Sequence, residues 1–159
     1  MNFKSTAKAF SLVELLIVIA IISIIGTIST SSFAKYRGNT CLREATRKIT
    51  GDIHLCKHKA VAENVRYRIL ISVSSNNYAV QKETSPSHWT SVSPIKNIGD
   101  NDESVKIIGD PTHWNDTIFF HPRGTTNGGT LILQHEKFRS KASIVTSLIG
   151  RVRVEYDLR

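Results

Sequence analysis

The chain has 159 residues and a formal net charge of +8, enough length for one folded domain beside a membrane segment. Its basic balance favours polyanionic partners or a negative membrane surface and carries no information about the fold. The sequence contains no G-x-S-x-G, P-loop, H-E-x-x-H or C-x-x-C motif, the patterns by which common enzyme classes are identified. We therefore expect no enzyme, no resident cofactor and no metal centre.

An apolar run from Phe10 to Phe33 dominates the N-terminal part, and Lys4 and Lys8 precede it. Within residues 12–28 the only ionisable side chain is that of Glu14, and a helix of this length spans about 25 Å, near the lower limit for a bilayer core. A cleaved signal peptide would place an A-x-A pattern after the run, which is absent. A plain anchor does not explain the carboxylate, because an intramembrane charge indicates a function. Two alternatives stay open: Glu14 lies at headgroup level, or the helix leaves the membrane to pack against other helices.

The segment Lys8-Ala9-Phe10-Ser11-Leu12-Val13-Glu14 combines a basic leader, a small residue, a phenylalanine and a glutamate. It resembles the leader and N-methylation motif of type IV pilins and type II secretion pseudopilins. The resemblance implies that residues 1–9 are a leader, that a prepilin peptidase cuts between Ala9 and Phe10, and that the new Phe10 amine is methylated. It further implies that Glu14 pairs with the N-terminal amine of a neighbouring subunit. The family usually has glycine where this chain has Ala9.

Residues 34–64 predict an amphipathic helix that continues the apolar helix of residues 10–33. Its apolar positions recur at steps of three and four and form one stripe: Leu42, Ala45, Ile49, Ile53, Cys56 and Ala60. Cys41 and Cys56 would lie about 22 Å apart on this helix, too far for a disulfide, so we expect buried free thiols. His54 and His58 share one helical turn, but no adjacent third ligand accompanies them.

After Asn64 the apolar period changes to two, which is typical of strands. We expect a strand over residues 65–73, a turn at Asn76-Asn77, and a strand over residues 78–82. Residues 83–116 are rich in polar and turn-forming residues and predict loops with short strands. Four further strands are expected at residues 117–121, 130–135, 143–148 and 151–156. The sequence thus predicts an α+β fold, with a long N-terminal helix packed on an antiparallel β-sandwich-like body over residues 65–159.

Three C-terminal segments point to a particular group within this family. They are Phe119-Phe120-His121-Pro122-Arg123-Gly124, Gly128-Gly129-Thr130-Leu131-Ile132-Leu133 and Gly150-Arg151-Val152-Arg153. In this order, and with Cys56-Lys57-His58-Lys59-Ala60-Val61-Ala62-Glu63-Asn64 at the helix-to-strand junction, they resemble the FimT/GspH group of minor pseudopilins. The resemblance implies a long helix packed on a β-sandwich-like body.

The basic C-terminal part supplies the candidate binding site, because residues 137–159 hold six basic and two acidic side chains. In a strand, Arg151 and Arg153 point to one face, about 6.5–7 Å apart, a spacing that suits successive phosphates of a nucleic acid. Gly-Arg-x-Arg also resembles the DNA-contact motif of FimT-type pseudopilins. Lys137, Arg139 and Lys141 have the same spacing and would extend this stripe, although lysines on an edge strand also serve against aggregation.

Two functions follow from these observations. One is a minor pilin that binds DNA without sequence preference during uptake in natural transformation. The other is a structural minor pseudopilin that primes or caps a type IV pilus or a type II secretion pseudopilus. Either predicts a bacterial inner-membrane protein with a single span and a periplasmic globular domain, later incorporated into a filament. The expected partners are DNA in the first case and, in both, other pilin subunits, prepilin peptidase and inner-membrane lipid.

Overall fold

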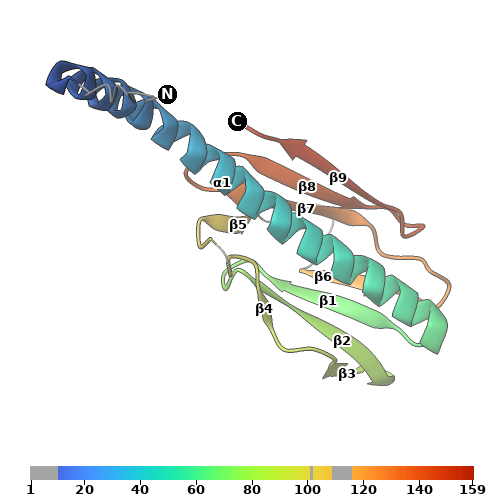
Figure 1. Cartoon of the computed structure of the whole chain (residues 1–159). Helices are drawn as coiled ribbons and strands as arrows, with labels where there is room; N and C mark the ends of the chain where they lie inside the picture. The colour runs from blue at the N-terminus through green and yellow to red at the C-terminus, as the bar shows by residue number, and fades with distance from the viewer. Residues whose placement is uncertain (1–10, 101, 109–115) are drawn as a thin grey trace, which may run out of the picture. The chain divides into compact units, whose positions relative to one another are not determined.

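Among the residues that the structure describes, one long helix leads into two antiparallel sheets (Figure 1). The computed structural model describes residues 11–100, 102–108 and 116–159, except for the side chains of residues 27–31. Helix α1 spans Leu12–Glu63 and contains 52 residues. The chain divides into two compact units, Met1–Tyr36 and Arg37–Arg159, which we describe separately.

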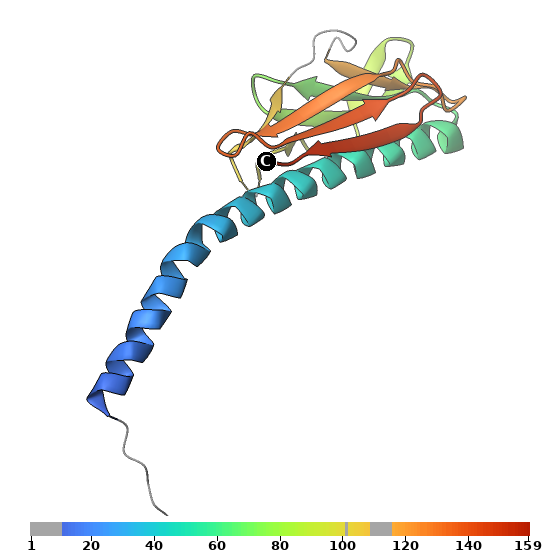
Figure 2. The ribbon, with the colours of Figure 1, turned by 90° about the horizontal axis from the view of Figure 1, so that it is seen from above.

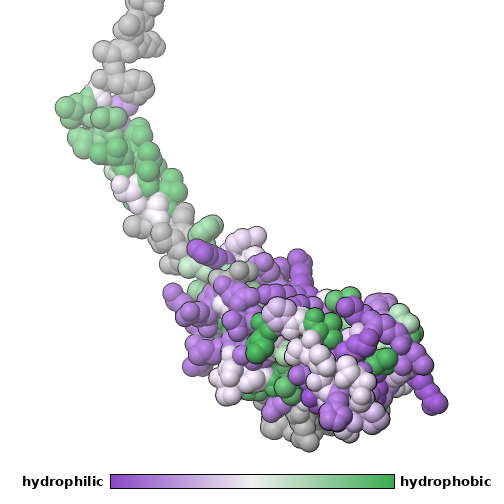
Figure 3. All heavy atoms as spheres, turned by 90° about the horizontal axis from the view of Figure 1, so that it is seen from below, coloured by the Kyte–Doolittle hydropathy of each residue, from purple (hydrophilic) through white to green (hydrophobic). Residues whose placement is uncertain are grey.

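In the first unit, the described side chains of residues 11–26 are all exposed. They include the apolar side chains of Leu12, Leu16 and Ile22, which are 74%, 53% and 62% exposed. Figure 3 shows these apolar atoms in green along the helix. Within the described residues, no helical stretch is both long enough and apolar enough to cross a membrane.

In the second unit, α1 buries one apolar stripe, as its periodicity predicts. Leu42, Ile53 and Ala60 are fully buried, and Ile49 and Cys56 nearly so. The helix ends at Glu63 because Asn64 adopts a left-handed conformation with a φ of 52°, which asparagine tolerates at helix C-termini. The first strand then begins at Tyr67.

The body contains two sheets in which every pairing is antiparallel. The first sheet has the order β3-β2-β1-β6, with β4 pairing β2, and the second has the order β5-β7-β8-β9. The strands of the first sheet are β1 (Tyr67–Ser72), β2 (Asn77–Ser85), β3 (His88–Ser91), β4 (Lys96–Asn97) and β6 (Thr117–Phe120). Those of the second sheet are β5 (Val105–Ile108), β7 (Gly129–His135), β8 (Lys141–Thr146) and β9 (Val152–Asp157).

One hydrophobic core joins the helix to both sheets. It includes Ile53 of α1, Ile69 and Phe120 of the first sheet, and Leu133 and Ile144 of the second, all at most 1% exposed. In Figures 1 and 2 the second half of α1 runs along these sheets. The predicted α+β fold is confirmed.

A buried carboxylate also ties the helix to the first sheet. Asp52 of α1 is 9% exposed and accepts a hydrogen bond from the Tyr78 hydroxyl at 2.6 Å and two from the Lys96 ammonium at 2.7 and 2.9 Å. Burial, together with the bond to Asp52, raises the pKa of Tyr78. The charge of Asp52 is thereby compensated within the core.

Candidate nucleic-acid interface

Arg153 lies on β9, which is an edge strand of the second sheet, and Arg151 directly precedes that strand. Arg151 and Arg153 are exposed, while the side chains of Val152 and Val154 are half-buried and pack against the core. The alternation expected from strand geometry is therefore present up to Val154. Tyr156 departs from it, because this residue is 41% exposed. Its ring lies 5.8 Å from the guanidinium of Arg43 on the helix.

The turn between β8 and β9 fixes the backbone from which Arg151 projects. The Gly150 N–H donates to the Ser147 carbonyl at 2.8 Å, and the Ser147 N–H donates to the Arg151 carbonyl at 2.9 Å. The Arg151 N–H in turn donates to the Ser147 hydroxyl at 3.1 Å. Because these bonds hold both ends of the turn, the Arg151 side chain starts from a defined position.

A hollow of about 180 Å³ lies beside the two arginines. It is lined by Val145, Ser147, Arg151, Arg153 and Glu155. The Arg153 guanidinium lies 3.6 Å from the Glu155 carboxylate, with both side chains more than 60% exposed, so this ion pair is weak. Among the described residues, Arg151 forms no ion pair with a carboxylate. Its charge is therefore available to a polyanion.

Lys137, Arg139 and Lys141 are also exposed, but they lie at the other end of the second sheet. Lys141 pairs with Asp157, whereas Arg153 pairs with Val145, four residues or about 13 Å along the strand. Glu155 and Asp157 follow Arg153 on β9. The two basic groups therefore do not form the continuous stripe that their shared spacing indicates.

Packing against the helix leads to the same conclusion. The turn that carries Lys137 and Arg139 contacts α1 at Gly38, where a Cβ would lie 2.6 Å from the Phe138 ring. The β8–β9 turn instead contacts α1 at Lys57, nineteen residues or about 28 Å further along the helix.

Two cations that sequence reasoning did not assign to the site lie next to the β8–β9 turn. Lys57 donates from its ammonium to the Gly150 carbonyl at 2.9 Å. Exposed Arg123 precedes Gly124, whose carbonyl oxygen would overlap a Cβ placed on Gly150. The sequence offers one signal for this contact, since both glycines belong to the segments that carry the resemblance. Nothing in the sequence indicates that they meet.

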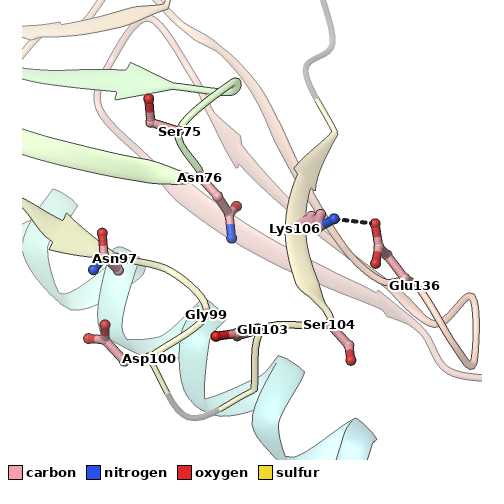
Figure 4. Close-up of a pocket in the computed structure, with 9 residues that line it drawn as sticks. All are labelled: Ser75, Asn76, Asn97, Gly99, Asp100, Glu103, Ser104, Lys106 and Glu136. Carbon is pink, nitrogen blue, oxygen red and sulfur yellow. Dashed lines mark ion pairs between the residues drawn. The ribbon is translucent and has the colours of Figure 1, made fainter.

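A hollow of about 780 Å³ in another part of the second unit has an acidic lining (Figure 4). Asp100, Glu103 and Glu136 line it together with Lys106, which is paired with Glu136 at 2.6 Å. Glu136 follows the end of β7 that is remote from the β8–β9 turn. An acidic surface repels nucleic acid, so this hollow does not fit a DNA-binding role.

The remaining candidate residues have different environments. Glu14 lies exposed on α1, whereas Ala9 and Phe10 lie outside the described residues. Cys41 is half-buried and Cys56 is buried, and both are free thiols, as expected from their separation. Burial raises the pKa of Cys56 to about 12.

Comparisons with known proteins agree with this architecture. The prokaryotic N-terminal methylation motif matches residues 4–30. The solved structure of the minor pseudopilin EpsH from the type 2 secretion system of Vibrio cholerae superposes with a TM-score of 0.59 at 12% identity, covering 72% of this chain and 96% of that one. The type IV minor pilin FimU of Pseudomonas aeruginosa gives a TM-score of 0.56 at 13% identity, covering 72% and 92%.

The chain has the N-terminal motif of prepilins and the fold of minor pseudopilins. The prediction of a type IV pilin-like minor pseudopilin is thereby confirmed in motif and fold. Comparison with curated protein sequences gives no match.

Proposed function

We propose that this chain is a minor pilin subunit that binds DNA without sequence preference during DNA uptake in natural transformation. In this proposal, prepilin peptidase cuts between Ala9 and Phe10, and Phe10 becomes methylated. The apolar half of α1 holds the subunit in the bacterial inner membrane, with the body in the periplasm, until Glu14 pairs with a neighbouring subunit's N-terminal amine in the filament. The methylation motif and the pilin-like fold support this assembly route.

The observation that carries DNA binding is the pair of exposed arginines at edge strand β9, with Arg151 directly before the strand and Arg153 on it. Both arginines line one hollow. Arg151 starts from a turn fixed by hydrogen bonds, and Arg153 extends from an edge strand that a polyanion can approach. Guanidinium groups bind phosphate oxygens in a bidentate manner. Binding of this kind is electrostatic and sequence-independent and weakens steeply with salt.

The test is DNA binding by the full chain in detergent, comparing the wild type with the double variant Arg151→Ala, Arg153→Ala. Each phosphate contact contributes about 0.9 to the slope of log K against log salt for duplex DNA. Loss of two contacts therefore makes the slope shallower by about 1.8. Between about 50 and about 200 mM salt, the wild type should lose about 12-fold more affinity than the variant. No binding by the wild type at low salt, or an unchanged slope in the variant, contradicts the proposal.

A structural role without DNA contact is the second candidate. It is favoured by the carboxylates of Glu155 and Asp157 on β9 near the arginines and by the likeness to a secretion pseudopilin. Under this alternative, the subunit primes or caps a type IV pilus or a type II secretion pseudopilus. The double variant would then assemble and function normally, and neither protein would bind DNA.

A further inference from the structure

Two turns from different sheets meet at a pair of glycines. Gly124, after β6, and Gly150, before β9, have φ angles of 78° and 72°, which glycine adopts without strain. A Cβ on Gly150 would overlap the Gly124 carbonyl oxygen and would lie 3.0 Å from the Lys57 Cε, and a Cβ on Gly124 would lie 3.7 Å from the same carbon. We call this contact between the residue 121–126 turn and the residue 147–151 turn the glycine seam.

Hydrogen bonds connect the two turns at the glycine seam. The Thr126 N–H donates to the Leu148 carbonyl at 2.9 Å, and the Thr126 hydroxyl donates to the Ser147 carbonyl, also at 2.9 Å. Thr126 is 5% exposed, so both bonds are protected from water. The two turns therefore act as one surface rather than as two independent loops.

This surface gathers three cations. Arg123 and Arg151 are the chain neighbours of the two seam glycines, and both are exposed. Lys57 gives one hydrogen bond to the Gly150 carbonyl, and its ammonium carries three donors. None of the three is paired with a carboxylate among the residues the structure describes.

Each of the two turns lines a hollow. Arg123 lines one of about 480 Å³ together with Asn64, His121, Pro122 and Thr125. Arg151 lines the other, of about 180 Å³, with Arg153. Because the two turns meet at the glycine seam, a nucleic acid strand that occupies both hollows would cross this contact.

We propose that Arg123 and Lys57 extend the DNA contact of Arg151 and Arg153 into one phosphate-binding track across the glycine seam. This inference rests on the proposed DNA-binding function and adds two phosphate contacts to it. Arg123 contacts phosphate from its exposed turn, and Lys57 adds positive charge at the centre of the track. The partner is the sugar–phosphate backbone, so the track reads no base sequence.

The test measures the salt dependence of DNA binding by the full chain in detergent for the wild type, Arg123→Ala, Arg123→Lys and Lys106→Ala. Lys106 is a charge-matched control, because its replacement also removes one positive charge, but in the acidic hollow at the other end of the second sheet. Arg123→Ala should make the slope shallower by about 0.9 on duplex DNA or about 0.7 on single strands. Arg123→Lys should keep the slope, and Lys106→Ala should leave it unchanged.

The outcomes separate this inference from the proposed function. If the double variant Arg151→Ala, Arg153→Ala lowers the slope and Arg123→Ala does not, the track is refuted while DNA binding at β9 stands. If Lys106→Ala lowers the slope as much as Arg123→Ala, the effect is one of net charge, and the track is again refuted. Absence of binding by the wild type at low salt refutes both proposals. Thermal unfolding of each variant shows whether a lost contact reflects a lost fold.

Discussion

The glycine seam predicts a large difference between two glycine-to-alanine substitutions. Gly150→Ala places a Cβ at a φ of 72°, which costs about 1–2 kcal/mol for an L-residue. The same Cβ overlaps the Gly124 carbonyl oxygen, so the turns must separate and the 2.9 Å bond from Lys57 to Gly150 is strained, which costs about another 1–2 kcal/mol. We expect a total loss of about 2–4 kcal/mol in the free energy of unfolding.

Gly51→Ala is the matched control. Gly51 is an exposed residue of α1, and a Cβ there would meet nothing within 4 Å. Alanine has the higher helix propensity, so this variant should gain about 0.5–1 kcal/mol.

Thermal unfolding of the full chain in detergent, followed by far-UV circular dichroism, measures both effects. For a unit of this size, 1 kcal/mol corresponds to about 3–5 °C in Tm. Gly150→Ala should therefore lower Tm by about 10 °C, and Gly51→Ala should raise it by about 3 °C. Equal Tm values for Gly150→Ala and the wild type would refute the close approach of the two turns. The Gly150→Ala protein, measured well below its Tm, should also bind DNA more weakly than the Gly51→Ala protein.

Three further substitutions or treatments test the core and the site. Burial raises the pKa of Cys56 to about 12, so almost no Cys56 thiolate is present near neutral pH. Iodoacetamide should therefore alkylate the half-buried Cys41 first. Equally rapid alkylation of Cys56 in the folded protein would contradict its burial. Asp52→Ala leaves the Tyr78 hydroxyl without its acceptor and the partly exposed Lys96 ammonium without its counter-charge. The free energy of unfolding should fall by about 2–3 kcal/mol, which lowers the urea midpoint of unfolding. An unchanged midpoint would show that the cluster contributes nothing to stability. Glu155→Gln removes a negative charge from the hollow that Arg151 and Arg153 line and should raise DNA affinity about 2–5-fold at low salt. This increase should shrink at higher salt, which screens the charge. Weaker binding by the variant would instead show that Glu155 helps to position Arg153.

The helix and most strands were predictable because their signals are local. Residues 42–60 bury the same stripe that their spacing predicts, and the strand that contains Leu131 and Leu133 buries alternate positions. Boundaries were less predictable. The strand expected from Val65 begins at Tyr67, because the left-handed Asn64 directs the Val65 N–H to the Ala60 carbonyl at 3.3 Å and so keeps Val65 in the helix cap.

The composition of the candidate site was only partly predictable, because it depends on contacts between distant segments. Two-residue spacing identifies two basic groups equally well, the pair Arg151 and Arg153 and the set Lys137, Arg139 and Lys141. Only the strand register shows that the two groups lie at opposite ends of the sheet. The glycine seam joins residues 26 positions apart, and the Lys57–Gly150 bond joins residues 93 apart. No periodicity contains that information. The cleavage, methylation and assembly roles of Ala9, Phe10 and Glu14 stay predictions.

Arg123 and Arg151 lie on turns, and the nearby C-terminal end of α1 does not help them to attract an anion. The C-terminus of a helix carries a partial negative charge, and the last turn of α1 contains Glu63 and no basic residue. An anion therefore gains nothing from the helix terminus itself, and side chains must supply all of the attraction. The acidic hollow at Glu136 lies at the other end of seven-residue β7, about 20 Å away, which is about two and a half times the screening length at physiological salt. Each end of the sheet then acts independently, so DNA affinity should follow the local cations of the two-turn surface rather than the net charge of the chain.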